Sequence, residues 1–144
     1  MGGVSDDGLA NLVGNTSLIC LRLGPGISDA GLAHLAGLTQ LTELRLDSAE
    51  NVTDAGMSHL NRLAKLETLS VQFTKVGDRG MDEVSHLPSL RRLEVNNTRI
   101  TDIGLSHLAR VTTLMSLTLS KKAVGKKALT AFKAALPNCQ VKEA

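Results

Sequence analysis

The feature that most constrains this chain is an apolar pattern that returns about every 24 residues. Its clearest copy covers residues 52–71 and contains two periods. Met57 and Leu60 recur at helical spacing behind a Thr-Asp pair, which is typical of a helix start. Leu69 and Val71 alternate with polar residues, as in a short strand with one buried face. One strand and one short helix cannot enclose a core alone, so the repetition predicts a solenoid of stacked copies.

Six copies cover residues 1–144, which we interpret as a single domain whose last repeat is a C-terminal cap. The first spacing is one residue short, and the missing residue falls in residues 24–26. The second is one residue long, and the extra residue falls in residues 47–51; both stretches are predicted loops. Lys126 replaces the aspartate of the last copy, as suits an atypical terminal repeat. The copies start near Val4, Ile27, Val52, Val76, Ile100 and Val124, at spacings of 23, 25, 24, 24 and 24 residues.

The strand pattern Leu-x-x-Leu-x-Leu, followed by Ile-Thr-Asp-x-Gly-Leu, resembles the leucine-rich repeat family. It is most similar to the helix-backed repeats of ribonuclease-inhibitor-like and F-box receptor proteins, and residues 27–35 are similar to repeats of planctomycete bacteria. The resemblance implies an α/β fold. Helices pack about 8–10 Å apart and strands about half that, so we expect a curved solenoid. Its parallel β-sheet should form the concave face and its short α-helices the convex face.

Local residues predict how each helix begins. Gly77 and Gly125 are weaker candidate caps, and the register of the last strand, within residues 136–141, has two solutions. The aspartate after each cap lies in the first helical turn, where the helix dipole favours a negative charge. Ser and Thr are expected as N-caps at Ser5, Ser28, Thr53 and Thr101, followed by Asp6, Asp29, Asp54 and Asp102.

Composition and cysteine positions exclude several classes of protein. The net charge of +2 indicates no particular polyanion, and no apolar run is long enough to span a membrane. The first residues lack the pattern of a signal peptide. Cys20 and Cys139 lie five strands apart, roughly 24 Å at the usual strand spacing, so they cannot form a disulfide within one chain. These features favour a reducing, cytoplasmic location.

No constellation of residues predicts catalysis, a cofactor or a metal site. His34, His59 and His107 share one repeat position, but helices about 8–10 Å apart cannot bring them to one zinc ion. Cys20 has no histidine near it on the predicted sheet face. The motifs G-x-S-x-G, P-loop, H-E-x-x-H and C-x-x-C are absent from the sequence. We therefore predict a protein that is not an enzyme.

A group of lysines lies near the C-terminal end. It is interpreted either as a solubilising cap over the last core layer or as a contact for an acidic partner or lipid surface. No aromatic residues are interleaved for base stacking, so we expect no nucleic-acid partner. The group comprises Lys121, Lys122, Lys126, Lys127, Lys133 and Lys142.

The concave face of the sheet is the candidate binding surface. Arg22, Arg45 and Arg92 are the expected anchors, because arginine is enriched at binding hot spots. Phe73 should lie at the rim. The alternative interpretation is a solvated surface whose Arg and Glu side chains pair across strands. The candidate residues are Arg22, Glu43, Arg45, Asp47, Ser70, Gln72, Phe73, Arg92, Glu94, Asn96 and Thr118.

Two classes of function remain open from the sequence. The first is a non-enzymatic scaffold that binds a protein or peptide, with a substrate-receptor fragment of a ubiquitin-ligase-type assembly as an alternative. No F-box-like segment precedes the first repeat, which counts against that alternative. The second class is a structural module that self-associates through its N-terminal repeat. That repeat has no polar cap, so Val4, Leu9 and Leu12 are expected to leave an apolar end exposed.

Overall fold

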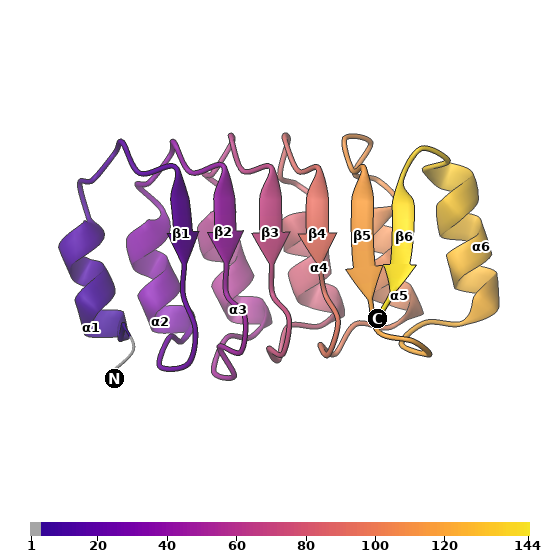
Figure 1. Ribbon diagram of the computed structural model, residues 1–144, viewed down its shortest axis with the longest axis horizontal. Helices are drawn as coiled ribbons and strands as arrows, with labels where there is room; N and C mark the ends of the chain where they lie inside the picture. The colour runs from indigo at the N-terminus through magenta and orange to yellow at the C-terminus, as the bar shows by residue number, and fades with distance from the viewer. Residues whose placement is uncertain (1–3) are drawn as a thin grey trace.

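A computed structural model describes residues 4–144. Six strands lie side by side in one parallel sheet in the order β1-β2-β3-β4-β5-β6, and each strand is followed along the chain by the helix of the next repeat until α6 leads into β6 (Figure 1). The strands are β1 Cys20–Arg22, β2 Glu43–Arg45, β3 Thr68–Ser70, β4 Arg92–Glu94, β5 Ser116–Leu119 and β6 Gln140–Glu143.

The helices begin at the predicted positions and are short. The first three each continue as a single turn of 3-10 helix, namely η1 Ala10–Leu12, η2 Ala33–Leu35 and η3 Ser58–Leu60. The α-helices are α1 Asp6–Leu9, α2 Asp29–Leu32, α3 Asp54–Met57, α4 Asp78–Val84, α5 Asp102–Leu108 and α6 Lys126–Ala135.

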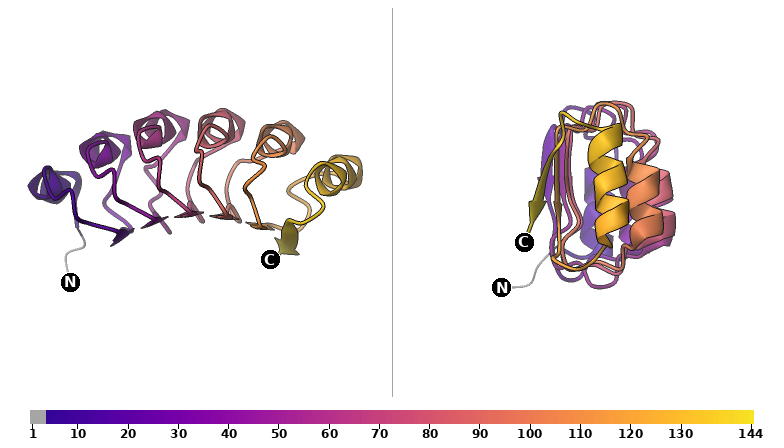
Figure 2. Two further views of the ribbon diagram at one scale, coloured as in Figure 1. Left: turned by 90° about the horizontal axis from the view of Figure 1, so that it is seen from above. Right: turned by 90° about the vertical axis from the view of Figure 1, so that its right-hand side faces the viewer.

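The stack of repeats is curved. Figure 2 shows the helices along the outer, convex arc and the strands along the inner, concave arc. This arrangement follows from the wider spacing of packed helices than of hydrogen-bonded strands. The predicted α/β solenoid, with a parallel sheet inside the curve, is confirmed.

One row of apolar side chains runs through the core from strand to strand. Leu44, Leu69, Leu93 and Leu117 lie in register and are fully buried. Val141 continues the row opposite Leu117, which resolves the two registers that the sequence allowed for the last strand.

The predicted helix caps are confirmed. Ser28 and Thr53 each accept a hydrogen bond from the backbone N–H two residues later, at 3.3 Å, and Thr101 does the same. Ser5 accepts from the Gly8 N–H at 3.4 Å. These bonds satisfy donors that a helix start otherwise leaves without a partner.

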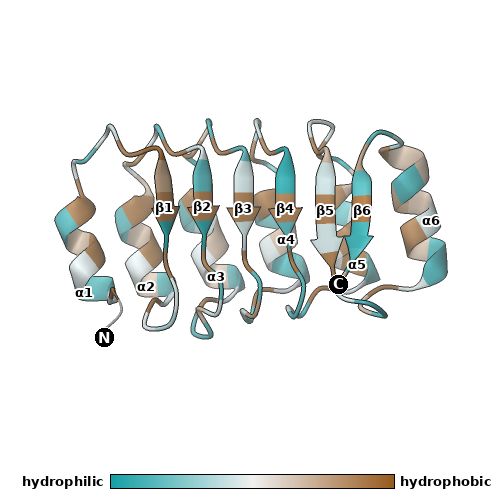
Figure 3. Ribbon diagram, in the orientation of Figure 1, coloured by the Kyte–Doolittle hydropathy of each residue, from teal (hydrophilic) through white to brown (hydrophobic). Residues whose placement is uncertain are grey.

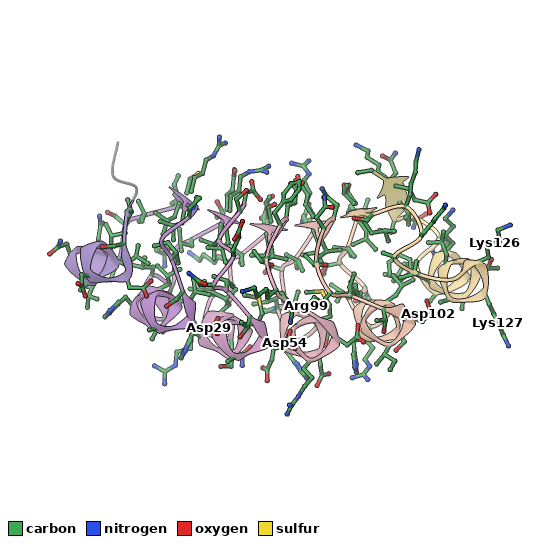
Figure 4. The ribbon with its side chains drawn as sticks, turned by 90° about the horizontal axis from the view of Figure 1, so that it is seen from below. Asp29, Asp54, Arg99, Asp102, Lys126 and Lys127 are labelled. Carbon is green, nitrogen blue, oxygen red and sulfur yellow. The ribbon has the colours of Figure 1, made fainter. Side chains whose placement is uncertain are left out.

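The aspartates after the caps do more than the sequence indicated, because each reaches into the next repeat. Asp29 accepts from the Thr53 N–H at 2.8 Å and from the Thr53 hydroxyl at 2.5 Å. Asp102 accepts from the Gly125 N–H at 2.7 Å. We call this series the aspartate ladder, and it follows the edge where the helices start (Figure 4). Its steps are Asp6 to Ser28, Asp29 to Thr53, Asp54 to Gly77, Asp78 to Thr101 and Asp102 to Gly125.

The ladder explains a glycine that recurs at the third helical position. A Cβ placed on Gly80 would lie 2.7 Å from Asp54 Oδ1, and one on Gly104 would lie 2.5 Å from Asp78 Oδ1. Such distances are too short for real contacts, so only glycine lets the aspartate of the preceding repeat approach. The last repeat carries Ala128 at this position and Lys126 at the aspartate position.

The N-terminal end differs in part from the expectation. Leu9 is fully buried, so the prediction that it is exposed was wrong, because the α2 layer covers it. Val4 is exposed, and Leu12 is partly buried against the core. Two further apolar side chains near this end, Val13 and Ile19, are also exposed.

The cysteines and histidines of residues 4–144 form neither a disulfide nor a metal-ligating group. Cys20 and Cys139 are both free thiols, and burial raises the pKa of Cys139. Within residues 4–144, no three His, Cys, Asp or Glu side chains are grouped so that they could hold a metal ion. His107 Nδ1 instead lies 3.4 Å from Asp82 Oδ1. No helix in the described part of the chain has the length and apolar character to cross a membrane.

Candidate functional site

The strand register places seven of the eleven predicted residues on the concave face in two rows, and the other four follow the strands. Each strand presents one residue on either side of its buried central residue, because side chains alternate between the faces of a sheet. Figure 3 shows hydrophilic residues on β2, β4 and β6, near-neutral ones on β3, and apolar bands across the strands. One row is Cys20, Glu43, Thr68, Arg92, Ser116 and Gln140, and the other is Arg22, Arg45, Ser70, Glu94, Thr118 and Lys142.

Arg45 is the centre of an ion network on this face. Its Nε lies 2.9 Å from Glu43 Oε1, and its Nη1 lies 3.4 Å from Glu94 Oε2 and 3.9 Å from Asp47 Oδ2. Arg22 joins through Glu43 at 3.3 Å. The hydrogen bond from Arg45 lowers the pKa of the Glu43 carboxyl, and the same bond raises the pKa of Arg45. The Arg45 guanidinium is therefore already paired with carboxylates of its own chain, as the interpretation of a solvated surface expects.

Two of the predicted residues, Ser70 and Gln72, donate hydrogen bonds to carboxylates of this network. Ser70 is fully buried and its hydroxyl donates to Asp47. Gln72 donates to the Ser70 hydroxyl at 3.1 Å and also to Glu94. Asn96 is only 6% exposed, and its Oδ1 is the one buried side-chain oxygen or nitrogen of residues 4–144 without a hydrogen-bond partner. Ser70 and Asn96 thus lie on the predicted face without being accessible from outside.

Arg92 differs from the other two arginines. It is exposed, and no carboxylate within residues 4–144 lies within ion-pair distance of it. It lines two neighbouring hollows of the concave face, with volumes of about 530 Å³ and 350 Å³. Met115, which is 52% exposed, lines both hollows with it.

We call the larger hollow the β4–β6 hollow. Thr118 and Glu94 belong to it, as predicted members of the binding face. The sequence analysis missed Met115, Asn138 and Gln140, and it assigned Lys142 to the terminal lysine group. The lining residues are Arg45, Arg92, Glu94, Met115, Ser116, Thr118, Asn138, Gln140 and Lys142.

Phe73 lies in the loop after β3 and is 51% exposed. Its φ of 57° is in the left-handed region. Ser48 and Asn97 occupy the same place after their strands, with φ of 64° and 56°. Small polar residues tolerate this conformation, but a bulky side chain is uncommon there and raises the backbone energy. An exposed phenylalanine at a strained position marks this loop as a candidate part of the site.

Comparisons with known proteins agree with the fold. A protein-family model described as Leucine Rich repeat matches this chain at residues 62–85 and again at residues 86–109. No curated protein matches the chain. Among solved structures, internalin C2 from Listeria monocytogenes str. 4b F2365 is similar, with a TM-score of 0.63 and 22% sequence identity. The similarity covers 98% of this chain, which spans 66% of that internalin chain.

The candidate site is therefore a concave sheet surface with an ion network at β2–β4 and an open cationic hollow at β4–β6. The repeated strand–helix unit, the two matched repeats within residues 62–109 and the similar internalin structure together show that the chain has the fold of a leucine-rich repeat solenoid.

Proposed function

We propose that the chain is a non-enzymatic scaffold whose β4–β6 hollow binds an acidic segment of a protein or peptide. The observation that carries the proposal is that Arg92 and Lys142 line one hollow and neither is within ion-pair distance of a carboxylate of residues 4–144. An arginine fork and an ammonium group both favour carboxylate ligands. Met115 adds an exposed apolar contact in the same hollow.

The surroundings of the hollow support the same role. Ser116, Thr118, Asn138 and Gln140 supply hydroxyl and amide groups that can orient a peptide. The strands beneath are held in a hydrogen-bonded sheet, and a preorganised surface loses less entropy on binding. Proteins built from leucine-rich repeats typically act as non-enzymatic scaffolds for other proteins, which agrees with the proposal. The alternative function, a substrate receptor of a ubiquitin ligase, would use this same face. A cytoplasmic location also stays a prediction.

The first prediction concerns charge reversal in the hollow. Peptides selected from a display library on the immobilised chain should be rich in Asp and Glu. We expect Arg92→Glu to raise the Kd of the selected peptide at least tenfold, equivalent to about 1.4 kcal/mol. Arg62→Glu is the matched control, because Arg62 is exposed and lies outside the sheet. Titration by fluorescence anisotropy measures both values.

The same measurement can contradict the proposal. Equal losses of affinity for Arg92→Glu and Arg62→Glu would indicate non-specific attraction to a cationic protein. A loss with Arg62→Glu alone would place binding on the convex side. Peptides with no acidic residues would contradict the ligand chemistry.

The second prediction separates stability from binding at Phe73. Phe73→Gly should leave the free energy of unfolding within about 1 kcal/mol, because relief of the left-handed strain offsets the greater freedom of glycine in the unfolded chain. The same change should weaken a ligand that extends from the hollow to the loop after β3. Asn97→Gly is the control, since Asn97 shares the backbone conformation but has no aromatic ring. If Phe73→Gly destabilises the fold by several kcal/mol, Phe73 has a packing role instead.

A further inference from the structure

The aspartate ladder defines a repeat-to-repeat interface that occurs several times within this chain. At each of the first four steps, one repeat offers an aspartate and the next offers a cap residue with a buried glycine three positions later. Thr101 and Gly104, for example, donate three hydrogen bonds to Asp78 at 2.5–2.9 Å. These cap–glycine pairs are Ser28 with Gly31, Thr53 with Gly56, Gly77 with Gly80, and Thr101 with Gly104.

The first repeat carries the same cap–glycine pair, and none of the described residues places an aspartate against it. Ser5 and Gly8 occupy the places of Thr101 and Gly104. A Cβ on Gly8 would meet only Val4 Cγ1 at 3.4 Å and Ser5 Oγ at 3.9 Å among the described residues. Gly8 is partly exposed, whereas the glycines of the four filled pairs are buried. The three residues before Val4 are Met, Gly and Gly, and none of them carries a carboxylate.

Apolar residues at the same end are less covered than their counterparts. Val4 is 50% exposed, whereas Ile27 and Val52, at the same repeat position, are fully buried. Three further positions that are buried in the second and third repeats are only partly buried in the first, namely Leu12, Leu18 and Leu21.

We infer that this N-terminal end is a docking face for a further leucine-rich repeat that carries an aspartate at the start of its helix. The strand of that repeat would pair with the free edge of β1, and its aspartate would accept hydrogen bonds from Ser5. Its apolar side chains would cover Val4 and Leu12. The occupant follows from continuity, because in the second to fifth repeats the cap residue and the glycine three positions later face the aspartate of the preceding repeat.

The inference excludes a second copy stacked head to tail. The last repeat has Lys126 where the ladder requires an aspartate, and the adjoining Lys127 adds a second positive charge (Figure 4). An ammonium group cannot accept a hydrogen bond from the Ser5 N–H or hydroxyl. The aspartate must therefore come from a repeat other than this chain's own terminal one.

A chain extended by one repeat tests the inference. A copy of residues 76–99 replaces the three residues before Val4, so that Val4 takes the place of Ile100 and the donated copy of Asp78 faces Ser5 and Gly8. The extended chain should unfold in one cooperative transition, with a higher midpoint in denaturant than the original chain. Changing only the donated aspartate to asparagine should remove part of that gain.

The decisive readout is the substitution Gly8→Ala in both backgrounds. In the original chain it should leave the equilibrium constant for folding unchanged or raise it, because a Cβ on Gly8 would make only ordinary van der Waals contacts. In the extended chain it should lower that constant at least tenfold, as expected when an aspartate occupies the site. Equal effects in the two chains, or separate unfolding of the added repeat, would overturn the inference. Dimerisation of the original chain that Gly8→Ala abolishes would assign the face to a second copy and also overturn it.

Discussion

Replacing Leu69 with alanine should lower the free energy of unfolding by about 2–5 kcal/mol. Leu69 is fully buried and lies in register between Leu44 and Leu93, at the centre of the sheet. Neighbouring repeats pack on both sides, so the cavity left by the substitution cannot collapse easily. Because each repeat is stabilised by its neighbours, loss in a central layer weakens the whole stack.

Thr68→Ala is the matched control in the same strand. Thr68 lies on the concave side, is only partly buried, and its hydroxyl has no hydrogen bond to residues 4–144. The control should therefore change stability by less than about 0.5 kcal/mol. Ser70 is unsuitable as a control, since its buried hydroxyl bonds to Asp47 and Gln72. Equal losses for Leu69→Ala and Thr68→Ala in chemical denaturation would contradict the strand register.

Much of the fold could be predicted because its rules are local and repeated. The alternation around Leu69 indicates which strand residues face the core, and Ser28 or Thr53 indicates where a helix starts. The register of β6 could not be predicted, because residues 136–141 break the repeat pattern and only pairing with β5 selects Val141.

The aspartate ladder was missed for a different reason. The recurrence of aspartate is explained equally well by the helix dipole and by contact between repeats, and only the distance between neighbouring helices separates these explanations. The glycine two positions later held the missing signal. A glycine within a helix is unfavourable unless something must approach its backbone closely, and at Gly104 that group is Asp78.

The candidate site was predicted only in outline. Alternation placed the right strand residues on the concave face, but it did not show which arginine is already paired. Arg45 reaches Glu94 two strands away, so the pairing depends on side-chain length across the sheet. Lys142 joined the hollow only once the register of β6 was known.

The ladder should be the polar contact whose loss costs most stability. Asp78 accepts hydrogen bonds from the Thr101 N–H at 2.7 Å, the Thr101 hydroxyl at 2.5 Å and the Gly104 N–H at 2.9 Å. Asp78→Ala removes both acceptor oxygens, and with them all three hydrogen bonds, and leaves the N–H of buried Gly104 without this partner, so we expect a loss of about 2–3 kcal/mol. Asp102→Ala, which removes one hydrogen bond to Gly125, should cost about 1 kcal/mol.

A double-mutant cycle with Gly104→Ala shows whether contact between repeats is the cause. Alone, Gly104→Ala forces a Cβ to within 2.5 Å of Asp78 Oδ1 and 2.7 Å of Ile100 Cγ1, and overpacking of this kind costs about 1–3 kcal/mol. In the Asp78→Ala background the first clash is gone and only Ile100 must move. The two substitutions should therefore be non-additive, with a coupling energy of about 0.5–3 kcal/mol. Strict additivity in urea denaturation would mean that Asp78 acts only within its own helix, through the dipole, and that the ladder does not hold the repeats together.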